Sequence, residues 1–301
     1  MKAIILAGGT GSRLYPLTQV SSKQLQAVYD KPMIYYPLTV LIAAGIRDFC
    51  IITTVQDRPR FESLLGNGRQ WGISIEYREQ ARPEGIAQAF LIAESFVGTD
   101  SVALMLGDNI FFGGDAFPRA MAEFKSGAFV FAYQVKRPQD YGVVEFDRTG
   151  KALSIEEKPA QPKSHYAVPG IYLYDNSVMS IAKALKPSAR GELEITDVNR
   201  VYLERGDLYV RRLSRGFAWL DAGTSSALQE ASAYIETIER RQGVKLGCPE
   251  EAALTRGFLT FGEFEQLVAT MPNCEYRDYL QGVSAELARQ PIGSAQGASA
   301  F

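Results

Sequence analysis

Hydrophobic positions in the first half of the chain follow two alternating patterns. Short apolar or alternating runs predict strands at Lys2–Ala7, Phe49–Thr54, Ser74–Glu79, Val102–Leu106 and Phe129–Gln134. Apolar residues at helical spacing predict intervening helices at Ile34–Ala44, Arg60–Leu65, Ile86–Ser95 and Ala116–Lys125. Strands that alternate with helices indicate an α/β, Rossmann-like fold, whose central sheet is mostly parallel and covered by helices on both faces.

The pattern changes near Gly142, where strands become more frequent. Strands are predicted at Gly142–Asp147, Ser154–Glu157, Gly170–Tyr174 and Leu208–Leu213, and helices at Ser177–Leu185, Glu194–Glu204 and Ser225–Gln242. The residues after Gly247 indicate a small helical appendage, and the Gly/Ser/Ala-rich stretch Gly293–Ala300 is typical of a flexible tail. We therefore expect a core over residues 1–246, divided near residue 141, and an appendage over residues 247–301.

Charge and composition narrow the possible functions. The chain has 32 basic and 34 acidic residues with no long run of one sign, so a nucleic-acid-binding surface is not expected. The weakly charged stretch Pro32–Ile46 is too short to cross a membrane, and Lys2–Leu6 is typical of a core strand rather than a signal peptide. Three widely spaced cysteines are typical of reduced thiols in a cytoplasmic protein. Any histidine-based triad or metal site would have to use His165, the single histidine.

A glycine-rich loop, Leu6–Leu14, follows the first predicted strand. Its glycines are Gly8, Gly9 and Gly11. Glycines allow close approach to a ligand and can direct N–H groups at phosphate oxygens. Leu14 stands where the dinucleotide-binding motif requires a third small residue, and the lysine of the P-loop motif is absent. The cations Arg13 and Lys23 beside this loop suit a triphosphate, although the loop alone is also compatible with a tight turn carrying two solvated cations.

A second loop with candidate chemistry follows the strand Val102–Leu106. Ligands of open parallel sheets bind outside the carboxyl ends of strands, where both the glycine loop and Asp108 are expected. By itself, Asp108 is equally well explained as a turn or helix-capping residue.

Ten segments together resemble the sugar nucleotidyltransferases, and among these the thymidylyl-transferring members. They are Gly8–Thr18, Ser22–Leu25, Tyr29–Pro37, Gln56–Asp57, Gln80–Ala89, Leu106–Phe111, Tyr141–Asp147, Glu156–Pro159, Ser188–Asp197 and Trp219–Asp221. The likeness extends over about residues 1–279. It implies a nucleotide-binding part over about residues 1–141 and a sugar-binding part over about 142–246.

The resemblance implies transfer of a thymidylyl group from dTTP to glucose 1-phosphate, which gives dTDP-glucose and pyrophosphate. A phosphate oxygen of the sugar attacks the α-phosphorus in line, and that oxygen is already anionic near neutral pH. No base is needed to activate it, so catalysis should depend on positioning and charge neutralisation. This explains how a chain with one histidine could perform the reaction.

Site residues follow from the resemblance, position by position. Those implied to hold the nucleotide are Gly8, Gly9, Gly11, Gln80, Gly85 and Asp108, with Gln80 and Gly85 at the thymine. Those implied to be catalytic are Arg13, Lys23, Asp108 and Asp221, with Asp108 and Asp221 as Mg²⁺ ligands. Those implied to bind the sugar phosphate are Gly142, Glu157, Lys158 and Val168. For Arg190, a phosphate contact and a structural ion pair are both considered, and the ion pair is favoured.

The resemblance also implies a homotetramer that acts on small molecules, without nucleic-acid or membrane partners. Pro169 and Ala222 depart from the family pattern beside the expected sugar pocket, so the exact hexose stays open. Phe112 and Thr255 lie where relatives form a regulatory nucleotide site, so regulation stays open too. A uridylyl- or other-hexose-using enzyme and a non-catalytic nucleotide-binding protein remain the alternative functions.

Overall fold

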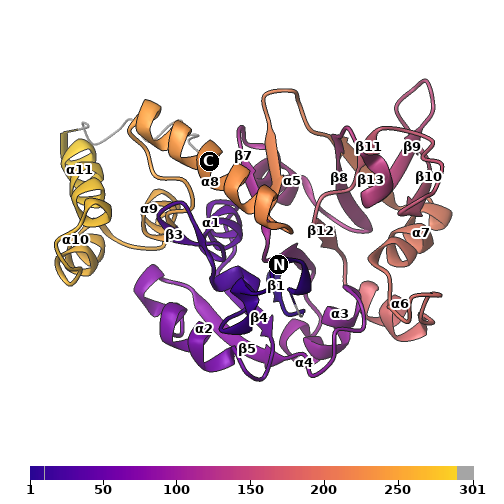
Figure 1. The fold of residues 1–301 in the computed structure, drawn as a ribbon, viewed down its shortest axis with the longest axis horizontal. Coiled ribbons are helices and arrows are strands. Elements are labelled where there is room, and N and C mark those ends of the chain that lie inside the picture. The colour runs from indigo at the N-terminus through magenta and orange to yellow at the C-terminus, as the bar shows by residue number, and fades with distance from the viewer. Residues whose placement is uncertain (10, 290–301) are drawn as a thin grey trace.

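The computed structural model describes residues 1–9 and 11–289, and its central feature is a large twisted sheet (Figure 1). Four strands run parallel in the order β5-β4-β1-β6. Their bounds are Lys2–Ala7 (β1), Asp48–Thr53 (β4), Ser74–Glu79 (β5) and Val102–Leu106 (β6). The predicted parallel α/β core is therefore confirmed.

The sheet continues beyond β6 with mainly antiparallel pairing. Strand β12 (Ile171–Tyr174) joins β6 to β8 (Ala128–Gln134), and is antiparallel to both. Farther along lie β11 (Tyr166–Ala167), β9 (Gly142–Phe146) and β10 (Ala152–Glu157), while β13 (Leu208–Arg212) pairs parallel with β8. A short hairpin of β2 (Ala27–Val28) and β3 (Lys31–Pro32) lies outside this sheet.

Helices cover the sheet and also make up the C-terminal segment that the sequence predicts as an appendage. Those of the core are α1 (Tyr35–Ala43), α2 (Arg58–Leu65), α3 (Gln88–Ile92), α4 (Glu94–Val97), α5 (Ala116–Glu123), α6 (Val178–Ala184), α7 (Ile195–Arg205) and α8 (Ser225–Gln242). The appendage contains α9 (Pro249–Thr255), α10 (Phe261–Ala269) and α11 (Glu275–Arg289), and the expected tail Gly293–Ala300 lies outside the described residues. The prediction of one helix over Ile86–Ser95 is wrong, because the backbone leaves helical geometry at Ala93 and separates α3 from α4.

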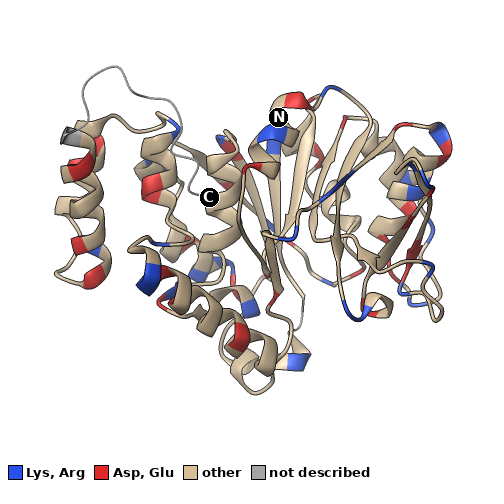
Figure 2. Ribbon diagram, turned by 90° about the horizontal axis from the view of Figure 1, so that it is seen from above, with Lys and Arg blue, Asp and Glu red and all other residues tan. Residues whose placement is uncertain are grey.

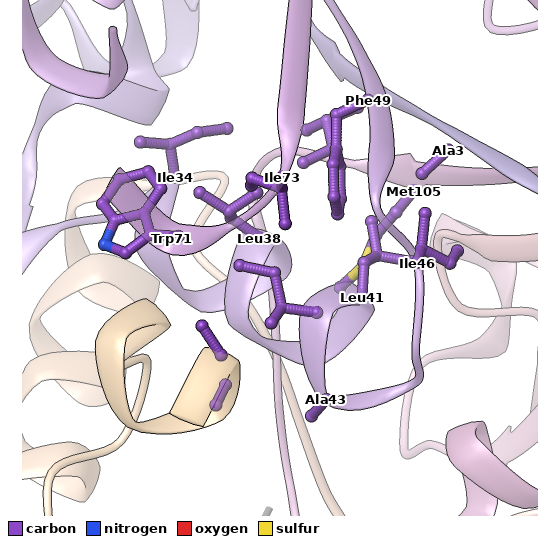
Figure 3. Packing of buried hydrophobic residues seen from close by; sticks show 14 of the residues in the cluster. Ala3, Ile34, Leu38, Leu41, Ala43, Ile46, Phe49, Trp71, Ile73 and Met105 are labelled. Carbon is purple, nitrogen blue, oxygen red and sulfur yellow. The ribbon is translucent and has the colours of Figure 1, made fainter. Parts of the chain in front are cut away.

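The hydrophobic core lies on both faces of the sheet because side chains alternate along each strand. In β1, Ala3 and Ile5 point to the face covered by α1, while Ile4 points to the opposite face, and all three are fully buried. Leu38 and Leu41 of α1 pack on the first face (Figure 3). Such burial contributes about 1.5–3 kcal/mol for each leucine side chain.

Charged residues lie mostly outside the central strands of the sheet. Figure 2 shows both signs interspersed along helices and loops, with the central strands largely free of them. In the part of the chain that the structure describes, every helix is too short or too polar to cross a lipid bilayer.

A separate two-stranded ribbon lies outside the large sheet. Strand β7 (Asn109–Phe112) pairs antiparallel with β14 (Ala218–Asp221), so that Asn109 lies opposite Asp221. The ring of Phe117 contacts those of Phe111 and Phe217 edge to face, with centroids 4.8 and 5.2 Å apart, and anchors the ribbon in the core. Neither strand was expected from the hydrophobic pattern.

Candidate active site

The candidate site lies where the order of the parallel strands reverses. β1 is flanked by β4 on one side and β6 on the other, so the loops after β1 and β6 leave the sheet beside each other. The first loop carries Gly8–Arg13 and the second carries Asp108. Such a switch point is the usual ligand-binding position of an open α/β sheet.

A small cavity of about 210 Å³ lies against the glycine loop. It is lined by Gly8, Gly9, Gly11, Ser12, Arg13, Lys23 and Gly223. Gly9 and Gly11 have φ angles of 95° and 57°, a region that glycine enters without the steric penalty of a side chain. A Cβ on Gly8 would lie 2.2 Å from Oε1 of Gln80. Glycine at that position therefore allows the Gln80 side chain to reach the loop.

A larger cavity of about 880 Å³ adjoins the first. Sequence-predicted residues that line it are Arg13, Asp108, Gly142, Glu157, Lys158, Val168 and Asp221. Arg13 and Gly223 line both cavities, so the two spaces adjoin each other at these residues. The structure thus places all four expected sugar-phosphate residues in one cavity and the glycine loop in the other.

The carboxylates of Asp108 and Asp221 are brought together by the β7–β14 ribbon. Asp108 immediately precedes β7, Asp221 ends β14, and the Ala222 N–H approaches the Asp108 carbonyl oxygen at 3.5 Å. Lys23 forms an ion pair with Asp108. Burial opposes ionisation of Asp108, but the Lys23 ammonium holds the pKa of this carboxyl below its ordinary value. Burial, and then the negative charge of Asp108, raise the pKa of Asp221.

Asn109 connects the aspartates to the surrounding sheet. Its Nδ2 donates to Asp108 Oδ1 at 2.9 Å, and its Oδ1 accepts from the Gly170 N–H at 2.9 Å and from Trp219 Nε1 at 2.7 Å. Because the side chain is almost completely buried, these bonds fix the Asp108 carboxylate. Sequence reasoning gave Asn109 and Trp219 no role, although their positions beside Asp108 and Asp221 were a usable signal.

One side of the larger cavity is built from β9, β10 and the start of α7. The Thr196 hydroxyl donates to Glu157 Oε2 at 2.6 Å, a contact that sequence reasoning missed. Lys158 has a φ of 42° in the left-handed region, which costs an ordinary residue about 1–3 kcal/mol and is typical of functional sites. Its N–H donates to the Tyr141 carbonyl oxygen at 3.0 Å. The Val168 N–H is bonded to the Gly142 carbonyl oxygen at 2.8 Å, so that N–H is already used within the protein.

The two expected thymine residues lie farther from the cavities. Gln80 is buried against Gly8 and is not among the residues that line either cavity. Gly85 has a φ of 104°, and a Cβ there would lie 2.4 Å from the Leu193 carbonyl oxygen. Close packing against Leu193 is therefore one reason for glycine at this position.

Arg190 lies as expected. Arg190 forms an ion pair with Glu194 at 2.8 Å, which is the structural role that the sequence favoured. His165 is exposed, away from both cavities, with Nδ1 3.3 Å from the Val135 carbonyl oxygen.

Comparison with known proteins decides the family. The family model described as nucleotidyl transferase matches residues 2–238, which include both aspartates and the glycine loop. The chain belongs to the nucleotidyl transferase family. This nucleotidyltransferase is 54% identical over 283 residues to a glucose-1-phosphate thymidylyltransferase of Neisseria meningitidis, with 93% of this chain and 98% of the relative covered. It is 55% identical over 281 residues to one of Mycolicibacterium smegmatis, with the same coverage.

Solved structures agree with this membership. A Bacillus anthracis protein, described as a proposed glucose-1-phosphate thymidylyltransferase, aligns with a TM-score of 0.72 at 49% identity. That alignment covers 78% of this nucleotidyltransferase and 94% of the other chain. A UDP-glucose pyrophosphorylase bound to UDP-glucose aligns with a TM-score of 0.69 at 23% identity, over 78% of this chain and 98% of that one, which shows a shared fold.

Proposed function

We propose that this enzyme transfers a thymidylyl group from dTTP to glucose 1-phosphate, giving dTDP-glucose and pyrophosphate. The observation that carries the proposal is the meeting of two cavities at Arg13, beside the paired carboxylates of Asp108 and Asp221. One cavity has the glycines and cations that suit a triphosphate, and the other has Glu157 and Lys158 for a sugar phosphate. Relatives more than 50% identical carry the name of this activity.

The two aspartates suit a magnesium ion. Within residues 1–9 and 11–289, no group of three or more His, Cys, Asp or Glu side chains is placed to hold a metal. A pair of carboxylates is nevertheless what Mg²⁺ commonly takes from a protein when substrate phosphates and waters complete its octahedron. Asp108 and Asp221 would hold the ion, which would neutralise charge on the phosphates in the transition state.

The protein's own groups position the two polyanions. Arg13 lies at the junction of the cavities, where it can contact both the triphosphate and the incoming phosphate. Lys23 lines the triphosphate cavity and pairs with Asp108, so it also fixes that carboxylate. Lys158 lines the larger cavity, where it can hold the sugar phosphate in line. We assign the nucleotide to the part over about residues 1–141 and the sugar to about 142–246.

A pair of variants tests this division of the cavities. Arg13→Ala should lower kcat by roughly 10²-fold, the size of losing one preorganised charge contact in the transition state. Lys158→Ala should mainly raise KM for glucose 1-phosphate, because Lys158 lines only the larger cavity. Steady-state kinetics with each substrate varied in turn measures both effects. The assignment is wrong if Lys158→Ala changes only the KM for dTTP.

Measuring which nucleoside triphosphate the enzyme prefers is the decisive test of the proposed activity. The Gln80 amide can pair with an edge that thymine and uracil share, so preference for dTTP must come from the 5-methyl group and the absent 2′-hydroxyl. One methyl in an apolar pocket is worth roughly 10–200-fold, so UTP should be a poor but measurable substrate and purine triphosphates should fail.

Pyrophosphate release measured for each nucleotide with several sugar 1-phosphates gives kcat/KM for each pair. Gln80→Ala should lower kcat/KM for dTTP and UTP alike, by about 10-fold, since it removes contacts that both bases make. A wild type that prefers UTP would favour the uridylyl-transferring alternative, and a Gln80→Ala variant that loses dTTP alone would overturn the assignment of Gln80 to the shared edge.

Two further proposals concern the whole protein. A homotetramer follows from the resemblance, and the appendage α9–α11 is small for an independent domain. A cytoplasmic location is supported by three free cysteines, of which Cys50 and Cys248 are buried and Cys274 is exposed.

A further inference from the structure

Behind Gln80 lies a chain of side-chain hydrogen bonds with no role in the function proposed above. Gln80 Nε2 donates to Gln88 Oε1 at 2.7 Å, and Gln88 Nε2 donates to Glu84 Oε2 at 2.8 Å. The backbone N–H of Glu84 also donates to Gln88 Oε1, at 3.2 Å. Gln88 is the first residue of α3, and Glu84 lies in the exposed loop before it.

The orientation of both amides follows from the chemistry of this chain. An ionised Glu84 carboxylate only accepts hydrogen bonds, so it requires the NH₂ end of Gln88. The Glu84 N–H only donates, so it requires the oxygen of Gln88, which agrees with the first constraint. With the Gln88 oxygen facing Gln80, Gln80 must present its own NH₂ group to α3. The exposed Glu84 thus determines which way the buried Gln80 amide points.

Because the NH₂ group of Gln80 faces α3, its oxygen Oε1 faces the opposite way. Its Oε1 lies against Gly8, at the position that a Cβ would occupy, and no described residue donates a hydrogen bond to it. One N–H of Nε2 is committed to Gln88, and the backbone N–H is bonded to the Thr53 carbonyl oxygen at 2.8 Å. Gln80 therefore offers its neighbours a fixed acceptor and one remaining donor.

We propose that Gln88 and Glu84 are positioning residues that hold the Gln80 amide in the orientation that accepts thymine and rejects cytosine. Thymine has an N3–H donor between two carbonyl acceptors, whereas cytosine has an unprotonated N3 beside a donating amino group. A fixed Oε1 accepts from the thymine N3–H but faces a lone pair on cytosine. An amide free to turn over would match either base. This inference rests on the proposed function, because it takes Gln80 to contact the base.

Two variants release the amide in different ways. Gln88→Met keeps the approximate volume and removes both hydrogen-bonding groups. Glu84→Lys, at an exposed position, replaces the acceptor by a donor, so that the side chain at position 84 no longer holds the NH₂ end of Gln88 and only the backbone N–H still favours the original orientation. Each should lower the ratio of kcat/KM for dTTP to that for dCTP by about 10-fold, the size of one exchanged hydrogen bond. The ratio of dTTP to UTP should stay within about twofold, since these bases share the edge.

Two control variants are expected to keep the wild-type preference for dTTP over dCTP. Glu84→Gln keeps an acceptor for Gln88 and should retain the wild-type ratio of dTTP to dCTP within about twofold. Glu76→Lys makes the same charge change on the exposed side of β5 and should also leave that ratio unchanged.

The possible results distinguish a failure of the proposed function from a failure of the positioning role of Gln88 and Glu84. A wild type that does not prefer dTTP to dCTP contradicts the proposed function, and with it the positioning role of Gln88 and Glu84. In another outcome, the wild type prefers dTTP while Gln88→Met and Glu84→Lys both keep the wild-type ratio of kcat/KM for dTTP to that for dCTP. That result overturns only the positioning role of Gln88 and Glu84. An equal loss with every nucleotide would mean a purely structural role and would also overturn it.

Discussion

Asp108→Asn and Asp221→Asn will each lower kcat on the order of 10³-fold, while the affinity for dTTP changes only a few-fold. The reason is that, in the proposed mechanism, these carboxylates act on charge that develops in the transition state, whereas Arg13, Lys23 and the glycine loop, which line the small cavity, would already hold the ground-state triphosphate. Pre-steady-state turnover and equilibrium binding of dTTP measure the two quantities separately. Excess chelator should abolish turnover of the wild type.

The control for these variants is Asp115→Asn, which changes an exposed aspartate that pairs with Arg119 at 2.6 Å. It should retain wild-type activity. Asp221→Asn should also melt at a slightly higher temperature in the absence of metal, because it relieves the repulsion and burial that raise the pKa of Asp221. Full activity of either active-site variant, or of the wild type in chelator, would contradict the proposed metal site.

Glu239→Gln is expected to destabilise the fold by about 3 kcal/mol without touching the active site. Glu239 is buried on α8, where Oε1 pairs with Lys31 at 2.8 Å and Oε2 pairs with Lys245 at 2.9 Å. Its Oε1 also accepts from the Leu246 N–H at 2.8 Å. Removing its charge leaves two poorly hydrated lysines with Asp30 as their remaining anion.

For a chain of this length, the loss corresponds to a fall in melting temperature of about 5 °C. Thermal unfolding followed by circular dichroism checks it, with urea titration as an independent measure. The matched control is Glu236→Gln, three residues earlier on the same helix, which removes an exposed pair with Arg240 and should change stability by less than about 0.5 kcal/mol. Equal stability of the two variants would show that the buried cluster contributes nothing specific.

Elements with local signals could be predicted from the sequence. Strand β1 and helix α8 have the predicted bounds, because an apolar run before glycines and a periodic stretch before Gly243 are encoded within each segment. Thr224 caps α8 by accepting from the Ala227 N–H, and Gly243 ends the helix in the left-handed region. The glycine loop was found for the same reason, since its chemistry lies in consecutive residues.

Features that depend on distant pairings could not be predicted in this way. The β7–β14 ribbon joins segments whose own hydrophobic patterns are too short to mark a strand. The bonds from Asn109 to Trp219 and from Lys31 to Glu239 link residues 110 and 208 positions apart. Such contacts are determined by topology and packing, and a single sequence contains no periodic trace of them. The resemblance supplied the pairing of Asp108 with Asp221, whereas residue patterns alone left Asp108 equally well explained as a turn or helix-capping residue.

The long separation between the two strands of the ribbon sets an order of events during synthesis. Asn109 and Trp219 are 110 residues apart, so at about 5–20 residues per second the ribosome needs roughly 5–20 seconds to make the second strand after the first. Until then the emerging chain has its glycine loop and Asp108 but lacks Asp221. A nascent chain thus carries only one of the two carboxylates proposed to hold the metal, and the pair is complete only after most of the polypeptide has been made.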